Sequence, residues 1–377
     1  MPALAVAEQL RRLGAHVTFI GGARAEAELV PAAGFPLLQL PVIGLSRTNP
    51  LRAAQALASA GASVVIAHRM LSRLGAHAVM GAGGYASGPV GLAALLARRP
   101  LVLTEADSRL GLANRLLAPY AHSVCLAFPI TEHRPSLLSA RVRSRCRVTG
   151  RPVFTPQEDR QRARERFALR GDAPCVLVFG GSLGARSINL AAIDGLAGLA
   201  PRIEVLHISG RREYRQLLTT ALPEGYQLIE YLERDELALA LCACDLVVSR
   251  AGGSLFEVAA HGKPAVLVPY PQATADHQTA NAAWMTAAGA ALTVPDVELT
   301  GSRLASEVLS LIESPGALEA MAAASAALAK PNAAQEVAEE LLAAAAGTRP
   351  SQPSAERDGR REERCSRGVD GSAGAGS

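Results

Sequence analysis

Gly180-Gly181-Ser182-Leu183-Gly184-Ala185-Arg186 is the stretch that decides the fold of this chain. It follows a short apolar run, Cys175–Phe179, and precedes a segment with helical character, Ile188–Leu199. A strand, a glycine-rich turn and a helix in this order favour phosphate binding, because glycines permit close backbone approach and the first helical turn presents free N–H groups to an anion. Taken alone, the pattern fits either nucleotide binding or a tight strand-to-helix connection.

The composition indicates an α/β protein without a metal or disulfide framework. The chain has 377 residues, enough for two domains and a tail, and 49% of them are apolar. Its formal net charge of +4 does not by itself suggest nucleic acid as a partner. The six cysteines are scattered, and Cys242 and Cys244 have no second pair nearby, which fits a reduced cytoplasmic interior. No apolar run reaches the ~18 residues that a membrane span needs, and no secretory signal opens the chain.

The first segments already alternate between helix and strand. Residues 2–13 are predicted to form a helix that Gly14 ends, and residues 16–20 to form a strand. A parallel α/β domain usually begins with a strand whose loop leads into the first helix. We therefore expect a β-strand and a loop upstream of Met1, the alternative being a domain that begins with a helix.

Further strands of the first half are predicted at residues 78–80, 101–104 and 124–127. Residues 63–74 are ambiguous, since 64–66 have strand character and 67–74 helical character. Glu105 and Asp107 lie just beyond the carboxyl end of the strand 101–104. This is the edge at which open parallel sheets bind ligands.

Four arginines alternate with smaller residues over positions 141–147. An extended chain would place all four on one face, either as a solvated edge or as a contact with anionic lipid or phosphate. The turn at residues 149–152 carries Gly and Pro and is predicted to join two domains.

The second half repeats the pattern. Strands are predicted at residues 175–179, 205–208, 227–231, 246–249, 265–269 and 291–294. The sequence thus predicts two Rossmann-like, doubly wound α/β domains, residues 1–150 and 151–346, facing a cleft. Residues 347–377 are rich in Ser, Gly, Pro, Arg and Glu and are predicted to be a disordered tail.

Three further turns lie at predicted strand ends of the second half. Tyr231-Leu232 offers backbone groups that suit a flat heterocycle, or is an ordinary turn. Ser249–Glu257 is rich in small residues, and the carboxylate of Glu257 suits a ribose diol or caps a helix. Asp276–Asn281 places Gln278 where it suits sugar hydroxyls, or forms a polar first turn.

These motifs together resemble the MurG family of glycosyltransferases. The resemblance is carried by four stretches in the order and approximate spacing of that family: residues 83–89, 180–186, 249–253 and 276–281. It implies the GT-B fold and an enzyme that transfers N-acetylglucosamine from UDP-N-acetylglucosamine, with inversion, to the C4 hydroxyl of lipid I in peptidoglycan synthesis. The acceptor belongs in the N-terminal domain and the donor in the C-terminal domain. Such chemistry needs a base near the hydroxyl and positive or N–H charge at the leaving diphosphate.

The resemblance also implies roles for individual residues. The substrate-binding set is Gly181, Ser182, Leu232, Arg250, Gly252, Gly253, Ser254, Glu257, Gln278 and Asp107. Within it, Ser182 approaches the donor diphosphate, Leu232 the uracil and Glu257 the ribose. Glu105 and Asp107 are the remaining candidates for acid–base work. No metal or other cofactor is expected, since no Asp-x-Asp clamp is seen.

The expected location is the cytoplasmic face of the plasma membrane, as a peripheral protein. The arginine run and an apolar patch near residues 40–75 are candidate contacts with the lipid surface. The expected partners are UDP-N-acetylglucosamine and lipid I, and no nucleic acid.

The sequence also departs from the family pattern. The family's glycine-rich loop with its His would precede Pro2, so we expect the chain to bind the donor and to be inactive or weak in transfer. Phe154 stands where the family has a basic residue, and the Ser249–Glu257 turn is one residue shorter. Three alternatives stay open: another UDP-sugar transferase of the same fold, a degenerate paralogue that only binds nucleotide sugar, and a sugar-nucleotide epimerase.

Overall fold

The computed structural model describes residues 2–41, 50–129, 139–154, 156–171, 173–200, 202–273 and 276–348. The chain forms two compact units. The N-terminal unit consists mainly of Val6–Ala106 and Leu110–Thr149 and takes in the last helix from Gln335 onward. The C-terminal unit consists mainly of Gly150–Ala334. The predicted tail lies outside the described residues beyond position 348.

The N-terminal unit contains two parallel sheets among its described residues. The smaller pairs β1 (Phe19–Gly21) with β2 (Leu37–Gln39), and the larger has the order β3 (Val79–Gly81), β4 (Leu101–Glu105), β5 (Ser123–Leu126), β6 (Cys146–Val148). The helices are α1 (Pro2–Arg12), α2 (Ala25–Ala32), α3 (Pro50–Leu74), α4 (Gly84–Leu96), α5 (Leu112–Leu117), the short η1 (Ala118–Tyr120), α6 (Ala140–Arg143) and α15 (Ala333–Ala345).

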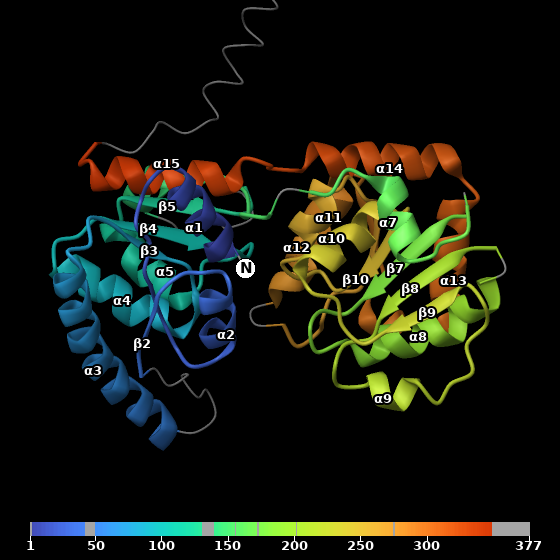
Figure 1. Ribbon diagram of the computed structural model, residues 1–377, viewed down its shortest axis with the longest axis horizontal. Helices are drawn as coiled ribbons and strands as arrows, with labels where there is room; N and C mark the ends of the chain where they lie inside the picture. The colour runs from blue at the N-terminus through green and yellow to red at the C-terminus, as the bar shows by residue number, and fades with distance from the viewer. Residues whose placement is uncertain are drawn as a thin grey trace, which may run out of the picture. The chain divides into compact units, whose positions relative to one another are not determined.

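The core of this unit lies between the four-stranded sheet and helices α3, α4 and α5 (Figure 1). Leu101, Leu103 and Val124 point from the strands into this core and are fully or almost fully buried. Gly91 lets α4 approach α5 closely, because a Cβ atom at this position would lie 2.6 Å from Cδ1 of Leu117. The sheet is therefore covered by helices that small residues bring near to one another.

The structure decides one ambiguous stretch of the N-terminal half and corrects the expectation for another. Residues 64–66 belong to the long helix α3 rather than to a strand, because their helical neighbours on both sides continue through them. Residues 141–147 are not extended: α6 occupies their first half and β6 begins at Cys146. The four arginines therefore share no face, and Arg147 is buried, where its guanidinium donates to the carbonyl of Cys146 at 2.8 Å.

The described strands of the C-terminal unit form one parallel sheet. Its order is β12 (Ala291–Thr293), β11 (Ala265–Leu267), β10 (Leu246–Ser249), β7 (Cys175–Phe179), β8 (Glu204–Ile208), β9 (Tyr226–Ile229). The helices are α7 (Arg160–Arg166), α8 (Arg186–Leu196), η4 (Ala197–Leu199), α9 (Tyr214–Leu217), α10 (Arg234–Ala243), α11 (Leu255–Ala260), α12 (His277–Ala287), η6 (Asp296–Glu298), α13 (Gly301–Ile312) and α14 (Pro315–Ala327).

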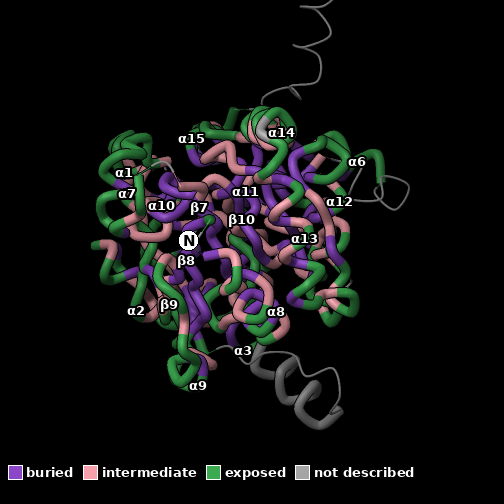
Figure 2. The backbone as a smooth tube through the Cα atoms, turned by 90° about the vertical axis from the view of Figure 1, so that its right-hand side faces the viewer, coloured by how far each residue is buried: buried purple, intermediate pink, exposed green. Residues whose placement is uncertain are grey.

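Both faces of this sheet are buried under helices, as a doubly wound fold requires (Figure 1). Side chains alternate along β7: Cys175, Leu177 and Phe179 join the core beneath α7, α10, α11 and α12. Val176 and Val178 join the core beneath α8 and α13. Figure 2 shows the buried strands β7, β8 and β10 inside helices whose outer sides are exposed.

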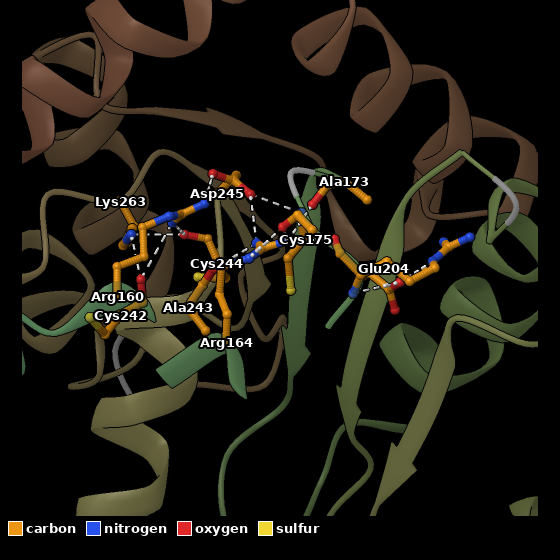
Figure 3. A network of polar contacts seen from close by, with 12 residues as sticks. Arg160, Arg164, Ala173, Cys175, Glu204, Cys242, Ala243, Cys244, Asp245 and Lys263 are labelled. Atoms are coloured by element: carbon orange, nitrogen blue, oxygen red, sulfur yellow. Dashed lines mark hydrogen bonds and ion pairs between the residues drawn. The ribbon is translucent and has the colours of Figure 1, made fainter. Parts of the chain in front are cut away.

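A polar network ties α7 to the end of α10, at the amino edge of the sheet (Figure 3). The terminal carbonyl groups of α10 accept hydrogen bonds from three cationic side chains, those of Arg160, Arg164 and Lys263. Asp245 accepts from Arg160 Nη2 at 2.7 Å and from the backbone N–H of Cys175 at 2.9 Å. Cations at a helix C-terminus satisfy its orphan carbonyls, so this network fixes the start of β7.

Within the described ranges, no helix is both long and apolar enough to cross a bilayer.

Candidate functional site

The carboxyl edge of the C-terminal sheet gathers most of the predicted site residues. The loops that follow β7, β10 and β11 leave three adjacent strands at this edge. Ligands of open parallel sheets bind there, because the loops and the N-termini of the following helices converge on one side.

The glycine loop between β7 and α8 is held tightly against the loop after β8. A Cβ atom on Gly184 would lie 2.0 Å from the carbonyl oxygen of Ser209, and one on Gly210 would lie 2.2 Å from the backbone N of Gly184. Both glycines have positive φ, +83° and +81°. Gly181, at φ +95°, and Ser182 are exposed at the tip of the loop. The base of the loop is thus rigid, while its tip faces solvent ahead of α8.

A buried hydrogen-bond chain supports the loop from below. Asn189, in the second turn of α8, donates through Nδ2 to the carbonyl of Ser209 at 2.9 Å and to Glu213 Oε2 at 3.0 Å. Its Oδ1 pairs with Nε2 of His207 at 3.1 Å, and Nδ1 of His207 pairs with the hydroxyl of Tyr226 at 2.8 Å. Burial lowers the pKa of His207 to about 4, so this ring is neutral at physiological pH.

Glu257 is the carboxylate of the site; the residue is half-buried, and its Oε2 atom is fully buried. It lies in the first turn of α11, and desolvation raises its pKa while the nearby Arg151 opposes that shift. Its Oε2 has no hydrogen-bond partner among the described residues. The guanidinium of Arg151 lies against Gly253, where a Cβ atom would come within 2.3 Å of its Cζ. A buried acceptor without a partner costs about 1–3 kcal/mol, which suits an atom that a ligand hydroxyl later satisfies.

Arg250, predicted to bind substrate, has its guanidinium engaged within the protein. Nη1 donates to Asp296 Oδ1 at 2.5 Å and Nη2 to the hydroxyl of Ser187 at 2.8 Å. The Ser187 hydroxyl in turn donates to Asp296 Oδ1 at 2.6 Å. The structure therefore brings Arg250 to the site edge as a cross-link between loops.

Gln278 lies beside Gly252, at the start of α12. Its Oε1 accepts from the backbone N–H of Tyr270 at 3.0 Å, and its Nε2 would lie 3.9 Å from a Cβ atom on Gly252. Asn281, one turn further on, donates to the carbonyl of Ala251 at 3.1 Å. The hydrogen bond of Asn281 thus joins α12 to the loop after β10, and the N–H₂ group of Gln278 faces that loop.

Two other predicted site residues, Leu232 and Ser254, are less exposed to solvent. The side chain of Leu232 is 8% exposed and packs in the core beneath α10, three residues past the end of β9. Ser254 is half-buried at the N-cap of α11, and no side-chain cap bond forms there. Any role of Leu232 in recognition would therefore involve its backbone.

In the N-terminal unit, Glu105 is buried at the end of β4, with a side chain that organises the following loop. Its carboxylate accepts from the backbone N–H of Ala106 at 3.1 Å and of Gly111 at 2.7 Å, and from Asn114 Nδ2 at 2.9 Å. Asp107, two residues on, has a side chain that is 43% exposed. Of the two carboxylates, Asp107 is the accessible one.

Across the described ranges, no group of three or more His, Cys, Asp or Glu side chains is arranged to hold a metal ion. The described cysteines are free and buried, and burial raises the pKa of Cys146 to about 11.

Parallel α/β units with a glycine loop and a carboxylate at one sheet edge are typical of nucleotide-binding folds, and the similarity to a solved MurG structure shows that this chain is a glycosyltransferase of the GT-B class. The Glycosyltransferase family 28 N-terminal domain matches residues 1–126, and the Glycosyltransferase family 28 C-terminal domain matches residues 175–337. The chain belongs to this family and, within it, to the MurG family.

The individual relatives are similar over almost their whole length. A protein of Moorella thermoacetica named UDP-N-acetylglucosamine--N-acetylmuramyl-(pentapeptide) pyrophosphoryl-undecaprenol N-acetylglucosamine transferase is 41% identical, over 90% of this chain and 94% of its own. A protein of Nitrosococcus oceani with the same name is 40% identical, over 92% and 95%. The crystal structure of Acinetobacter baumannii MurG is 31% identical with a TM-score of 0.71, over 90% of this chain and 95% of its own.

Sequence reasoning missed three residues of this site. Asp296 and Ser187 are 109 positions apart, and nothing in either neighbourhood marks them as partners of Arg250. Arg151 lies in the predicted turn between domains, and its position in that turn does not mark it as a site residue. His207 is a polar residue within the apolar run of β8, and this position indicates that its ring is hydrogen-bonded. Which residues are its partners follows only from the fold.

Proposed function

We propose that this protein transfers N-acetylglucosamine from UDP-N-acetylglucosamine to the C4 hydroxyl of lipid I, with inversion at the anomeric carbon. The observation that carries the proposal is the similarity, at about 40% identity over nine-tenths of the chain, to relatives named for this transfer. In the reaction the bond from the sugar C1 to UDP breaks, a bond from C1 to the acceptor oxygen forms, and the hydroxyl proton leaves to a base.

The C-terminal unit holds the donor. The exposed tip of the glycine loop, Gly181 and Ser182, and the N-terminal N–H groups of α8 meet the diphosphate. These donors stabilise the charge that develops on the leaving UDP, and the rigid base of the loop keeps them in place. No metal ion is invoked for this step.

The remaining donor groups are recognised at neighbouring loops. Glu257 accepts hydrogen bonds from the ribose diol, which satisfies its unpartnered Oε2. The backbone at Leu232 pairs with the uracil, and Gln278 binds hydroxyls of the sugar through its Nε2. The small residues Gly252 and Gly253, followed by Ser254, permit the ligand to come close to the backbone before α11.

The N-terminal unit receives the acceptor. Asp107 lies in the loop after β4, in a short segment that groups with the C-terminal unit, and contacts the acceptor sugar, since its side chain is 43% exposed. Glu105 serves as the support of the loop that carries Asp107, because its own oxygens accept three hydrogen bonds from that loop and from α5. Replacing Asp107 with Asn is expected to raise the KM for the acceptor, whereas Glu105→Gln is expected to destabilise the unit.

We place the protein at the cytoplasmic face of the plasma membrane as a peripheral protein, where lipid I is presented. Exposed apolar side chains support this: they lie on α4 and α5, which pack together, and on η1, namely Leu92, Leu96, Leu112, Leu116 and Tyr120. The cationic side chain of Arg141 lies 5.8 Å from the ring centroid of Tyr120. An apolar patch beside cations suits an anionic lipid surface.

The test is transfer of radiolabelled N-acetylglucosamine to a short-chain lipid I analogue by the full chain. We expect a labelled disaccharide product with release of one UDP for each sugar transferred. Transfer only to a different acceptor would identify another UDP-sugar transferase, and donor binding without transfer would identify a nucleotide-sugar-binding protein. Conversion of the donor into its C2 epimer, with no acceptor present, would replace the proposal with an epimerase.

A further inference from the structure

Arg250 links the loops at the ends of four strands of the C-terminal sheet. It follows β10 directly, and its Nη1 donates to the carbonyls of Val268 at 3.1 Å and Pro269 at 3.3 Å, just after β11. The same nitrogen reaches Asp296, after β12, and Nη2 reaches Ser187 in the first turn of α8, after β7. One side chain therefore sets the spacing of the loops around the donor site.

Asp296 is the group that holds Arg250 in this position. The carboxylate lies 2.5 Å from Nη1, and the side chains of Arg250 and Asp296 are 12% and 21% exposed. Charge-assisted hydrogen bonds of this kind are the strong ones in proteins, more so where water is partly excluded. Ser187 closes a triangle by donating to the same carboxylate oxygen at 2.6 Å.

The cross-link continues from Arg250 to Gln278. The carbonyls of Val268 and Pro269 immediately precede Tyr270, whose backbone N–H donates to Oε1 of Gln278 at 3.0 Å. The guanidinium also lies 5.4 Å from the ring centroid of Tyr270. Because Oε1 is occupied by Tyr270, the amide of Gln278 directs Nε2 toward the loop at Gly252.

We propose that Asp296 is a positioning residue for the donor sugar. Asp296 fixes the guanidinium of Arg250, and Arg250 fixes the turn at residues 268–270. That turn orients the side-chain amide of Gln278, which recognises the donor sugar. The proposal rests on the proposed function for the identity of the donor. It separates recognition of the sugar, which depends on this relay, from recognition of UDP, which depends on the glycine loop and Glu257.

The test compares the binding of UDP-N-acetylglucosamine with that of UDP by calorimetry. We expect Asp296→Ala to weaken binding of the sugar nucleotide about tenfold while binding of UDP changes less than about threefold. With the lipid I analogue as acceptor, the KM for the donor rises and kcat at saturating donor changes little. Asp296→Asn keeps an oxygen that accepts from Arg250 and is expected to recover most of the lost affinity. Glu298→Gln, in the same turn, is the matched control and should behave as wild type.

Two further measurements keep the inference open to refutation. Gln278→Ala should show the same selective loss, and adding Asp296→Ala to it should cost little more, because both changes act on one amide. Fluorescence of Trp284, the single tryptophan of the chain, checks that each variant is folded. If Asp296→Ala is unfolded, Asp296→Asn and Ser187→Ala carry the test and should show a smaller loss with the same selectivity.

Equal weakening of both ligands by Asp296→Ala in a folded protein, or no weakening of either by that variant, would overturn the inference alone. Failure of the wild-type protein to bind UDP-N-acetylglucosamine would overturn the proposed function as well. The two failures are distinguishable, since only the second appears in the unaltered chain.

Discussion

Gly184 and Gly210 meet backbone to backbone, and neither position has room for a side chain. The Cβ atom of an alanine at Gly184 would lie 2.0 Å from the carbonyl oxygen of Ser209, and that of an alanine at Gly210 would lie 2.2 Å from the backbone N of Gly184. Both residues also have a positive φ that L-residues rarely adopt. The contact joins the loop after β7 to the loop after β8, so the shape of the diphosphate loop depends on it.

We expect Gly184→Ala and Gly210→Ala each to lower the free energy of unfolding of the C-terminal unit by about 2 kcal/mol or more, because backbone must move in both. The measurement is urea unfolding followed by fluorescence of Trp284, which stacks on Phe256 within that unit. Gly198→Ala is the control, since a Cβ atom there meets nothing within 4 Å. If both loop variants unfold at the same urea concentration as the wild type, the two loops are not in tight contact.

The fold of the C-terminal unit was predictable because its strands are buried on both faces. Apolar runs bounded by polar or glycine-rich turns mark such strands clearly, and β7 and β10 have the predicted bounds, Cys175–Phe179 and Leu246–Ser249. The N-terminal unit was harder. The strand predicted at 16–20 is β1 at Phe19–Gly21, and the arginine run was misjudged because alternation of charge does not distinguish a strand from a short helix and turn.

The candidate site was predictable only where chemistry follows local sequence. The glycine loop follows β7 directly, and Glu257 and Gln278 lie in the first turns of the helices that follow β10 and β11, so all three were found from the strand-to-helix pattern. Asp296 and Arg151 were missed because their roles come from contacts with residues 46 and 102 positions away, which no local pattern encodes. Arg250 was predicted as a site residue because it directly follows a strand. Its ion pair with Asp296 was not predictable from the local sequence.

The neutral His207 predicts an acid-labile C-terminal unit. The folded state holds the pKa of this ring at about 4, below its ordinary value of 6.5, because charging it would place a cation in the core. Its contribution to stability is therefore fully present above pH 6.5 and is lost as pH falls toward 4, by up to about 3 kcal/mol. Urea unfolding at a series of pH values measures this loss.

Two substitutions separate the titration of His207 from its hydrogen bonds. His207→Gln is expected to flatten the dependence on pH between 6.5 and 4, since it removes the group that titrates. Tyr226→Phe removes a partner of the ring and lowers stability at every pH, but it should leave the slope in place. An unchanged slope in His207→Gln would assign the acid lability to another group.

The raised pKa of Glu257 predicts that donor binding strengthens as pH rises through it. Two ribose hydroxyls need an ionised acceptor, and burial of the Glu257 carboxyl group favours its protonated form. The same shift makes the folded unit less stable as pH rises, because the native state then holds a buried charge. Calorimetry with UDP-N-acetylglucosamine, which has no terminal phosphate to titrate, isolates this effect.

We expect Glu257→Gln to bind the donor at least about tenfold more weakly and with little dependence on pH. Glu298→Gln, at an exposed turn, should retain both the affinity and the pH profile of the wild type. A pH profile that survives in Glu257→Gln would show that another group controls binding.

Alanine substitutions at Gly253 and Gly252 form a matched pair that tests whether Arg151 affects the ionisation of Glu257, because only Gly253 contacts Arg151. A Cβ atom on Gly253 would come within 2.4 Å of three guanidinium atoms of Arg151, whereas the nearest atom to one on Gly252 is 3.9 Å away. The guanidinium is the flexible end of its side chain, so Gly253→Ala should displace Arg151 at a cost of less than about 1 kcal/mol in stability. Once Arg151 is displaced, the cation that opposes the raised pKa of Glu257 is further away.

We therefore expect Gly253→Ala to shift the pH dependence of donor binding to higher pH, because Glu257 then ionises less readily. Gly252→Ala leaves Arg151 in place and should keep the wild-type profile, although its methyl group lies nearer to Gln278 and can alter sugar affinity. Arg151→Met should reproduce the shift without any change at Gly253. Matching profiles for Gly253→Ala and wild type, in a folded protein, would mean that Arg151 does not govern the ionisation of Glu257.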